Sequence, residues 1–69
     1  MEFSEQLKSY RKSLGKTQEE MADFIGFPVR TYRSWEQGKR IPIKIYREMI
    51  LIKIDREMIL KKIMEGGKK

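Results

Sequence analysis

Hydrophobic residues recur along this chain at steps of three and four positions, the spacing of helices that bury one face. The pattern predicts helical segments over residues 4–14, 18–25, 29–36 and 43–64. In the first segment Ser4 is the predicted N-cap, and Gly15 supplies the stop. Every segment has the helical period, so the fold class predicted is all-α.

Residues 17–38 contain the most closely spaced signals. Thr17 and Glu20 match the capping box at the start of a helix. Gly26 follows that helix where a left-handed residue is needed, and Pro28 stands at the start of the next helix. Two short helices with so tight a joint predict a helix-turn-helix, the unit that presents its second helix to the DNA major groove.

The side chains of this unit divide into an inward and an outward set. The predicted inward set is Met21, Ala22, Ile25, Phe27, Tyr32 and Trp35. The predicted outward set on the second helix of the unit is Val29, Arg30, Arg33 and Ser34. Arg11 lies beside the apolar stripe of residues 4–14, and a half-buried guanidinium needs an acceptor. Glu36 is the candidate acceptor.

The segment after Pro42 contains an internal repeat. Residues 44–51 read KIYREMIL and residues 53–60 read KIDREMIL. An offset of nine residues is about 180° on an α-helix, so one unbroken helix would point the two apolar faces in opposite directions. A break near Asp55, which can cap a new helix, would give separate fourth and fifth helices. This arrangement is the favoured one.

The alternative is that helices four and five are merged into one long helix with a coiled-coil seam. The seam positions, interrupted by Arg56, would be Ile45, Met49, Ile52, Ile59 and Ile63. In both arrangements the large apolar residues exceed what a three-helix core can cover, which predicts a homodimer through this segment. We expect a domain over residues 1–64 and a flexible basic tail over residues 65–69.

Composition narrows the function. The 69 residues carry 16 Lys+Arg against 10 Asp+Glu, and the net charge of +6 favours polyanionic partners. Cysteine and histidine are absent, which excludes disulfides, the common zinc sites and the Ser-His and Cys-His nucleophile pairs. We therefore expect no metal, no cofactor and no enzymatic activity. No apolar run approaches the ~20 residues of a membrane span, so a cytoplasmic protein without a membrane partner is expected.

Many positions between residues 7 and 42 form one combined motif, which is more specific than a single glycine pair. They are Leu7, Arg11, Gly15, Thr17, Gln18, Ala22, Gly26, Trp35, Glu36, Gly38, Lys39, Arg40 and Pro42. With these residues the chain resembles the phage-repressor type of helix-turn-helix, the Xre/Cro-like family of bacterial and phage regulators. The resemblance implies a compact five-helix, lambda-repressor-like domain that binds double-stranded DNA as a two-fold dimer, in association with the nucleoid.

The resemblance also implies roles for individual residues. Base contacts would come from the positions Val29, Arg30, Arg33 and Ser34. Gln18 would contact a phosphate, and Lys39 and Arg40 would clamp the DNA backbone. Arg11 and Glu36 would form a structural ion pair that ties the first helix to the end of the third. The chain departs from the family at Pro28, where a capping Ser or Thr is usual.

Side-chain chemistry supports the same division into base-contacting and phosphate-contacting residues. Arg30 is the best predicted reader, because arginine can donate two hydrogen bonds to guanine, worth ~1–3 kcal/mol. Lys16 and Lys44 join the phosphate-contacting set on the grounds of charge and position. Each phosphate contact should add about −0.9 to the slope of log affinity against log salt.

Three functions fit these patterns. The favoured one is a sequence-specific transcriptional regulator, a repressor that binds a two-fold operator with residues 29–36 in the major groove. The second is an antitoxin-type autoregulator that also binds a toxin partner, because Ile54, Asp55 and Arg56 resemble a turn in regulators paired with mRNA-cleaving toxins. The third is a protein-interaction domain that retains the fold without specific DNA binding.

Overall fold

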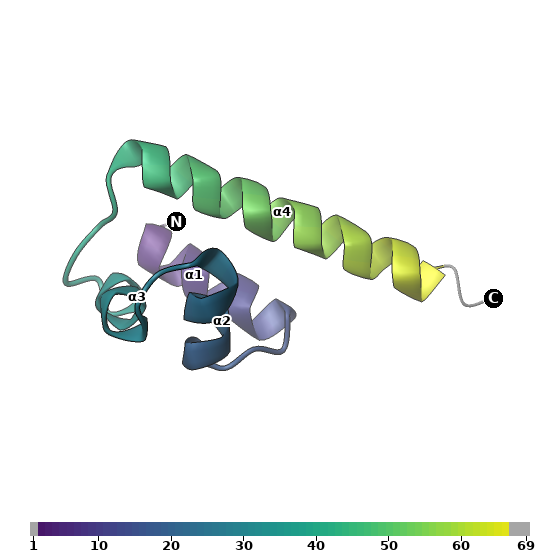
Figure 1. Cartoon of the computed structure of the whole chain (residues 1–69), viewed down its shortest axis with the longest axis horizontal. Helices are drawn as coiled ribbons and strands as arrows, with labels where there is room; N and C mark the ends of the chain where they lie inside the picture. Colours follow the sequence, from purple (N-terminus) through teal and green to yellow (C-terminus); the bar gives the residue numbers. More distant parts are fainter. Residues whose placement is uncertain (1, 67–69) are drawn as a thin grey trace.

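Four helices form the part of the chain that the computed structural model describes, residues 2–66. They are α1 (Phe3–Ser13), α2 (Gln18–Ile25), α3 (Val29–Glu36) and α4 (Lys44–Gly66). Figure 1 shows α1, α2 and α3 as a three-helix body, with α4 lying across one side of it. The all-α prediction is confirmed, but this part of the chain holds four helices and not five.

α1 begins one residue earlier than the sequence pattern predicts. Its N-cap is Glu2, which makes no side-chain capping hydrogen bond, so the prediction that Ser4 caps this helix is wrong. Phe3 packs against the core and is already helical, and the amide of Gln6 donates to the Glu2 carbonyl at 3.0 Å. The packing of Phe3 against the core therefore stabilises a first turn that has no polar cap.

The joint between α2 and α3 has the features that its sequence predicts. Both hydrogen bonds of the capping box are present, from the Glu20 amide to Thr17 Oγ1 at 3.1 Å and from the Thr17 amide to Glu20 Oε1 at 2.9 Å. Gly26 adopts φ 85°, a left-handed conformation that glycine reaches without steric cost. Pro28 is the N-cap of α3 and offers no side-chain acceptor, yet the helix begins at Val29 as expected.

The core lies where all four helices meet. Its buried apolar side chains are Leu7, Met21, Ala22, Ile25, Tyr32, Trp35, Ile50 and Ile54. Phe27 is half-buried, and its ring meets Trp35 edge-on at 4.8 Å and Tyr46 edge-on at 5.3 Å between centroids. Phe24 is also half-buried and packs against the core from α2. Each fully buried large apolar side chain is worth about 1.5–3 kcal/mol, so α4 contributes to the stability of the body through Ile50 and Ile54.

The C-terminal repeat forms one continuous helix, so the favoured break near Asp55 is wrong. Asp55 is exposed in the middle of α4 and caps nothing. The repeat nevertheless behaves as its nine-residue offset requires. Ile45 is 54% exposed, whereas its counterpart Ile54 is 1% exposed. At this position of the repeat, one copy therefore faces water and the other faces the core. The helix needs no break to accommodate both copies.

Three basic side chains attach α4 to the rest of the molecule. Arg47 Nη1 donates to the carbonyl of Pro42 at 2.7 Å, near the start of the helix. Lys53 Nζ donates to the Phe24 carbonyl at 3.2 Å, and Lys61 Nζ donates to the Ser13 carbonyl at 2.8 Å. The last two carbonyls lie at the C-terminal ends of α2 and α1, where cations are favoured.

α4 continues past the body, as Figure 1 shows, and the molecule measures 43 × 22 × 22 Å. Glu65 and Gly66, predicted as the start of a flexible tail over residues 65–69, belong to α4. Residues 67–69 lie outside the described part of the chain. Within that part, no helix has the length and apolar character to cross a membrane.

Candidate nucleic-acid interface

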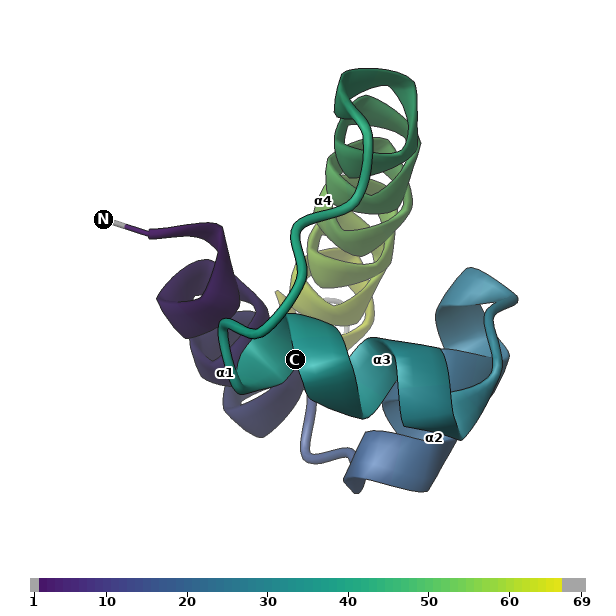
Figure 2. The same cartoon turned by 90° about the vertical axis from the view of Figure 1, so that its left-hand side faces the viewer.

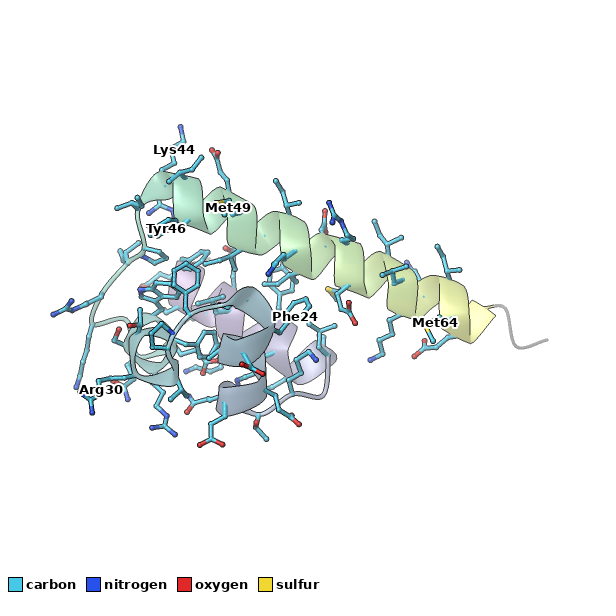
Figure 3. All side chains as sticks on the ribbon, viewed as in Figure 1. Phe24, Arg30, Lys44, Tyr46, Met49 and Met64 are labelled. Atoms are coloured by element: carbon cyan, nitrogen blue, oxygen red, sulfur yellow. The ribbon has the colours of Figure 1, made fainter. Side chains whose placement is uncertain are left out.

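α3 presents a basic face on the side opposite to its buried residues. Tyr32 and Trp35 are buried, whereas Arg30 and Arg33 are exposed. Figure 3 shows Arg30 projecting from the body on the side away from α4. Val29 and Ser34, the other two predicted base-contacting residues, are half-buried. These four residues are called the reading face below.

A buried carboxylate fixes the C-terminal end of α3. Glu36 is 3% exposed and lies between helices. Arg11 of α1 donates from Nε to Glu36 Oε2 at 2.7 Å and from Nη2 to Oε1 at 3.4 Å. Tyr32 donates its hydroxyl to Oε2, and Gln18 donates from Nε2 to Oε1 at 3.0 Å. The four donors satisfy both oxygens, as a buried charge requires.

The pKa values of this cluster follow from burial and hydrogen bonding. Burial alone would raise the pKa of Glu36, but the hydrogen bonds from Arg11, Tyr32 and Gln18 outweigh it, so this pKa is lowered. Burial and the bond to Glu36 raise the pKa of the Tyr32 hydroxyl well above its ordinary range. At neutral pH Glu36 is therefore a carboxylate and Tyr32 is a neutral donor. These charge states are those of a structural hydrogen-bond network.

Gln18 connects the buried network to the reading face. Its Nε2 donates to Glu36, and its Oε1 accepts a hydrogen bond from Arg33 Nε at 3.2 Å. Arg33 also approaches Glu19, with 4.0 Å between Nη2 and Oε2. A primary amide has two N–H donors, so Gln18 retains one for another acceptor. The first turn of α2 and the middle of α3 are thus held at a defined spacing.

The loop after α3 adds further positive charge beside the reading face. Gly38 adopts φ 77°, which turns the chain so that the amides of Lys39 and Arg40 both reach the Ser34 carbonyl, at 3.0 and 3.4 Å. Lys39 and Arg40 are exposed. A shallow hollow at this edge is lined by Arg30, Thr31, Ser34 and Arg40. The hollow is therefore lined by two arginines and two hydroxyl-bearing residues, of which Ser34 donates its hydroxyl to the Thr31 carbonyl at 2.7 Å.

Comparison with known proteins identifies this arrangement. The model of a helix-turn-helix family matches residues 7–48, more than half of the chain. The chain belongs to the phage-repressor-like helix-turn-helix family. It is 40% identical over 42 residues to the cryptic phage CTXphi transcriptional repressor RstR of Vibrio cholerae serotype O1 (strain ATCC 39315 / El Tor Inaba N16961). That alignment covers 61% of this chain and 38% of the relative, and no solved structure matches.

Helix-turn-helix proteins of this type are DNA-binding transcription regulators and not an enzyme family. The predicted site residues can now be located on the family's fold. Gln18 and Arg33 are joined by a hydrogen bond. Arg30, Ser34 and Arg40 line one hollow, and the amide of Lys39 donates to the Ser34 carbonyl. Lys16 lies directly before the N-cap of α2, with its Nζ 5.1 Å from the centroid of the Phe24 ring. Among residues 2–66, no group of acidic, histidine or cysteine side chains could hold a metal ion.

Lys44 is the predicted phosphate-contacting residue that the fold does not bring to this surface. It is the first residue of α4, and Figure 3 shows it projecting from the top of that helix, away from Arg30. Lys44 is close to Arg40 in sequence, but residues 41–43 lie between them and lead the chain away from α3 to the start of α4. Figure 2 shows this connector rising from the end of α3 to the start of α4.

Two features of the site were absent from the sequence-based prediction. The family resemblance indicates only a phosphate contact for Gln18, whereas the structure shows its side chain between Arg33 and Glu36. Tyr32 was predicted as a core residue, without the hydroxyl bond to Glu36. The four-residue spacing of Tyr32 and Glu36 on one helix is the signal that indicates this bond.

Proposed function

We propose that this chain is a sequence-specific DNA-binding transcriptional regulator, a repressor that acts by occupying its operator. The observation that carries the proposal is the exposed arginine pair of α3 in a helix-turn-helix whose other side is buried. Arg30 would read a guanine with two hydrogen bonds, and Arg33 would contact a base or a phosphate from the same face. Val29 would pack on a thymine methyl group, and Ser34 would bond to a base edge at the margin of the helix.

Phosphate contacts would orient the domain without reading sequence. Lys39 and Arg40 flank the reading face from the loop, and Gln18 keeps one amide donor for a phosphate. The phage protein RstR, to which this chain is 40% identical over 42 residues, is a transcriptional repressor, and this supports the direction of regulation. The matched part is well under half of that relative, so repression itself is part of the proposal.

In-vitro selection from random duplexes tests the proposal. A shared sequence motif should be enriched, and the enriched duplex should bind Arg30→Ala more weakly by ~1–3 kcal/mol, roughly 5- to 150-fold in Kd. Binding of that variant to a random duplex should fall only by the loss of one charge. Lys44→Ala is the matched control, because it removes one positive charge at the start of α4, on the side of the molecule away from Arg30. No enrichment at low salt, or equal losses of Arg30→Ala on both duplexes, would contradict the proposal.

A further inference from the structure

The outward side of α4 carries a row of apolar side chains that DNA reading does not use. They are 54–63% exposed: Ile45, Met49, Ile52, Ile59 and Ile63. With Arg56 between Ile52 and Ile59, the row follows alternating steps of four and three residues, the 3.5-residue period of a coiled-coil seam. These six residues are called the seam below. It extends along about 27 Å of the helix, at 1.5 Å per residue.

The seam and the reading face point in opposite directions. On α4 the seam lies roughly 180° around the helix from Ile50 and Ile54, which are buried against the body. Figures 1 and 2 place α4 on one side of the body and α3 on the other. In Figure 3 Arg30 projects from the far side of the body, whereas Lys44 at the start of α4 projects away from it.

We propose that a second copy of this chain covers the seam, and that the resulting pair is a bridge between two DNA segments. In a two-fold pair the two seams face each other, so the bodies of the two copies lie on opposite sides of the contact. The two reading faces then lie on opposite outer sides of the pair, where one straight duplex cannot reach both. The bridging step rests on the proposed function, because it needs each reading face to bind DNA.

The seam is self-complementary when the two helices run antiparallel. A dyad beside residue 54 aligns Ile45 with Ile63 of the second copy and Met49 with Ile59 of the second copy. Ile52 then lies against the stem of Arg56 of the second copy, whose guanidinium can extend to water. Along one edge of the contact, Glu48 comes beside Lys62 of the second copy, and both are exposed. Every seam position therefore has a counterpart, and the same edge also brings Asp55 beside Asp55 of the second copy, a like-charge pair that weakens the contact.

A parallel pair is less favourable on two grounds. Arg56 would face Arg56 of the second copy in the same layer, so two like charges would meet in the seam. Isoleucines would also occupy the three positions Ile45, Ile52 and Ile59, where parallel two-stranded coiled coils prefer leucine. The antiparallel pair avoids both.

The area of the seam predicts a weak pair. A fully buried apolar side chain of this size removes roughly 60–120 Å² from water, and about half of each seam side chain is exposed. Two copies would then cover a few hundred Å² of apolar surface, less than the ~1,200 Å² of a standard stable interface. Pairing should depend on concentration and strengthen when DNA holds two copies near each other. The bridge would thus form preferentially between occupied sites.

A bridging assay tests the proposal. A biotinylated duplex of the selected sequence is fixed on beads with protein, and retention of a second, fluorescent copy of that duplex is measured. Ile59→Glu should keep the affinity for a single duplex and lose about tenfold or more of the retained fluorescence. Met64→Glu is the matched control, because Met64 is 71% exposed on α4 but lies outside the seam. It should bridge like the wild type.

Disulfide cross-linking tests the pairing without DNA, since the chain has no native cysteine. An equimolar mixture of Met49→Cys and Ile59→Cys should form a disulfide-linked dimer on oxidation, and Met49→Cys alone should not, because a disulfide needs Cα atoms within about 7 Å. Two results would overturn the proposal: no cross-link at high protein concentration, and bridging by Ile59→Glu equal to that of the wild type. Binding to single duplexes without retention of a second duplex would overturn the bridge but leave the proposed function intact.

Discussion

The substitution Arg11→Ala tests the contact that joins α1 to the end of α3. It removes the Nε donor at 2.7 Å and the Nη2 donor at 3.4 Å from a carboxylate that is 3% exposed. Loss of one partner from a buried ion pair costs about 3–5 kcal/mol, because the other charge stays buried. Tyr32 and Gln18 still donate to Glu36. We therefore expect a loss at or below the lower limit of that range, about 2–3 kcal/mol.

That loss is large for a domain of this size, whose total stability is on the order of 5 kcal/mol. At about 4–8 °C per kcal/mol, Tm should fall by roughly 10–20 °C in thermal unfolding followed by circular dichroism. The double variant Arg11→Ala/Glu36→Gln supplies the control, because it leaves no stranded charge. It should be more stable than Arg11→Ala alone. An unchanged melting curve for Arg11→Ala, or additive losses in the double variant, would refute the reasoning.

The same cluster predicts a pH dependence. Hydrogen bonds from Arg11, Tyr32 and Gln18 hold the folded-state pKa of Glu36 below its ordinary value. The stability that this shift contributes is present above about pH 4.3, the unfolded value, and is lost as the pH falls through the lower folded value. Arg11→Ala has already lost most of it. The difference in unfolding free energy between the two proteins should therefore shrink below about pH 4, in urea unfolding at several pH values.

Three further substitutions test the local structure and the DNA contacts. Thr17→Ala removes the cap of α2 and should lower the unfolding free energy by ~1 kcal/mol in urea titrations. Thr31→Ala, which removes a threonine that caps no helix, is the control. An equal effect of the two substitutions would show that the cap is unimportant. Gly26→Ala should cost ~1–2 kcal/mol through its left-handed backbone alone, because no atom lies within 4 Å of the added Cβ. Gly26→Asn should cost less, and a neutral Gly26→Ala would contradict the strain argument. Lys39→Gln/Arg40→Gln should make the slope of log affinity against log salt shallower by ~0.9 for each phosphate contact removed. The change should be equal on selected and random duplexes. An unchanged slope would place the loop outside the DNA interface.

The helix-turn-helix could be predicted from the sequence because its signals are local. Thr17 and Glu20 need only each other to cap α2, and Gly26 needs only its own backbone freedom to end it. The three-residue step between Tyr32 and Trp35 likewise places both side chains on one face of α3 without reference to any other helix. Each of these signals depends on residues within one or two turns, so the tertiary structure did not alter them.

The predictions that failed depend on competition between local and tertiary effects. Ser4 is a good capping residue, but the apolar contact of Phe3 with the core extends α1 past it. Asp55 is also a good capping residue, but a continuous α4 keeps every backbone hydrogen bond of a helix and still buries Ile50 and Ile54. The double role of Gln18 depends on side chains 15 and 18 residues away, which no local spacing indicates.

The repeat in α4 explains how so short a chain can stabilise its body and carry a second surface with one helix. An octapeptide duplicated at nine residues appears on opposite sides of an α-helix. Ile50 and Ile59 are the same position of the repeat, yet Ile50 is 1% exposed in the core and Ile59 is 56% exposed in the seam. A duplication at seven residues would instead have put both copies on one face. The α4 sequence therefore ties the buried contact and the exposed row together. An insertion of one or two residues directly after Met58 should move Ile59 and Ile63 around the helix and abolish bridging, while Ile50 and Ile54 keep their places in the core and the body still binds a single duplex.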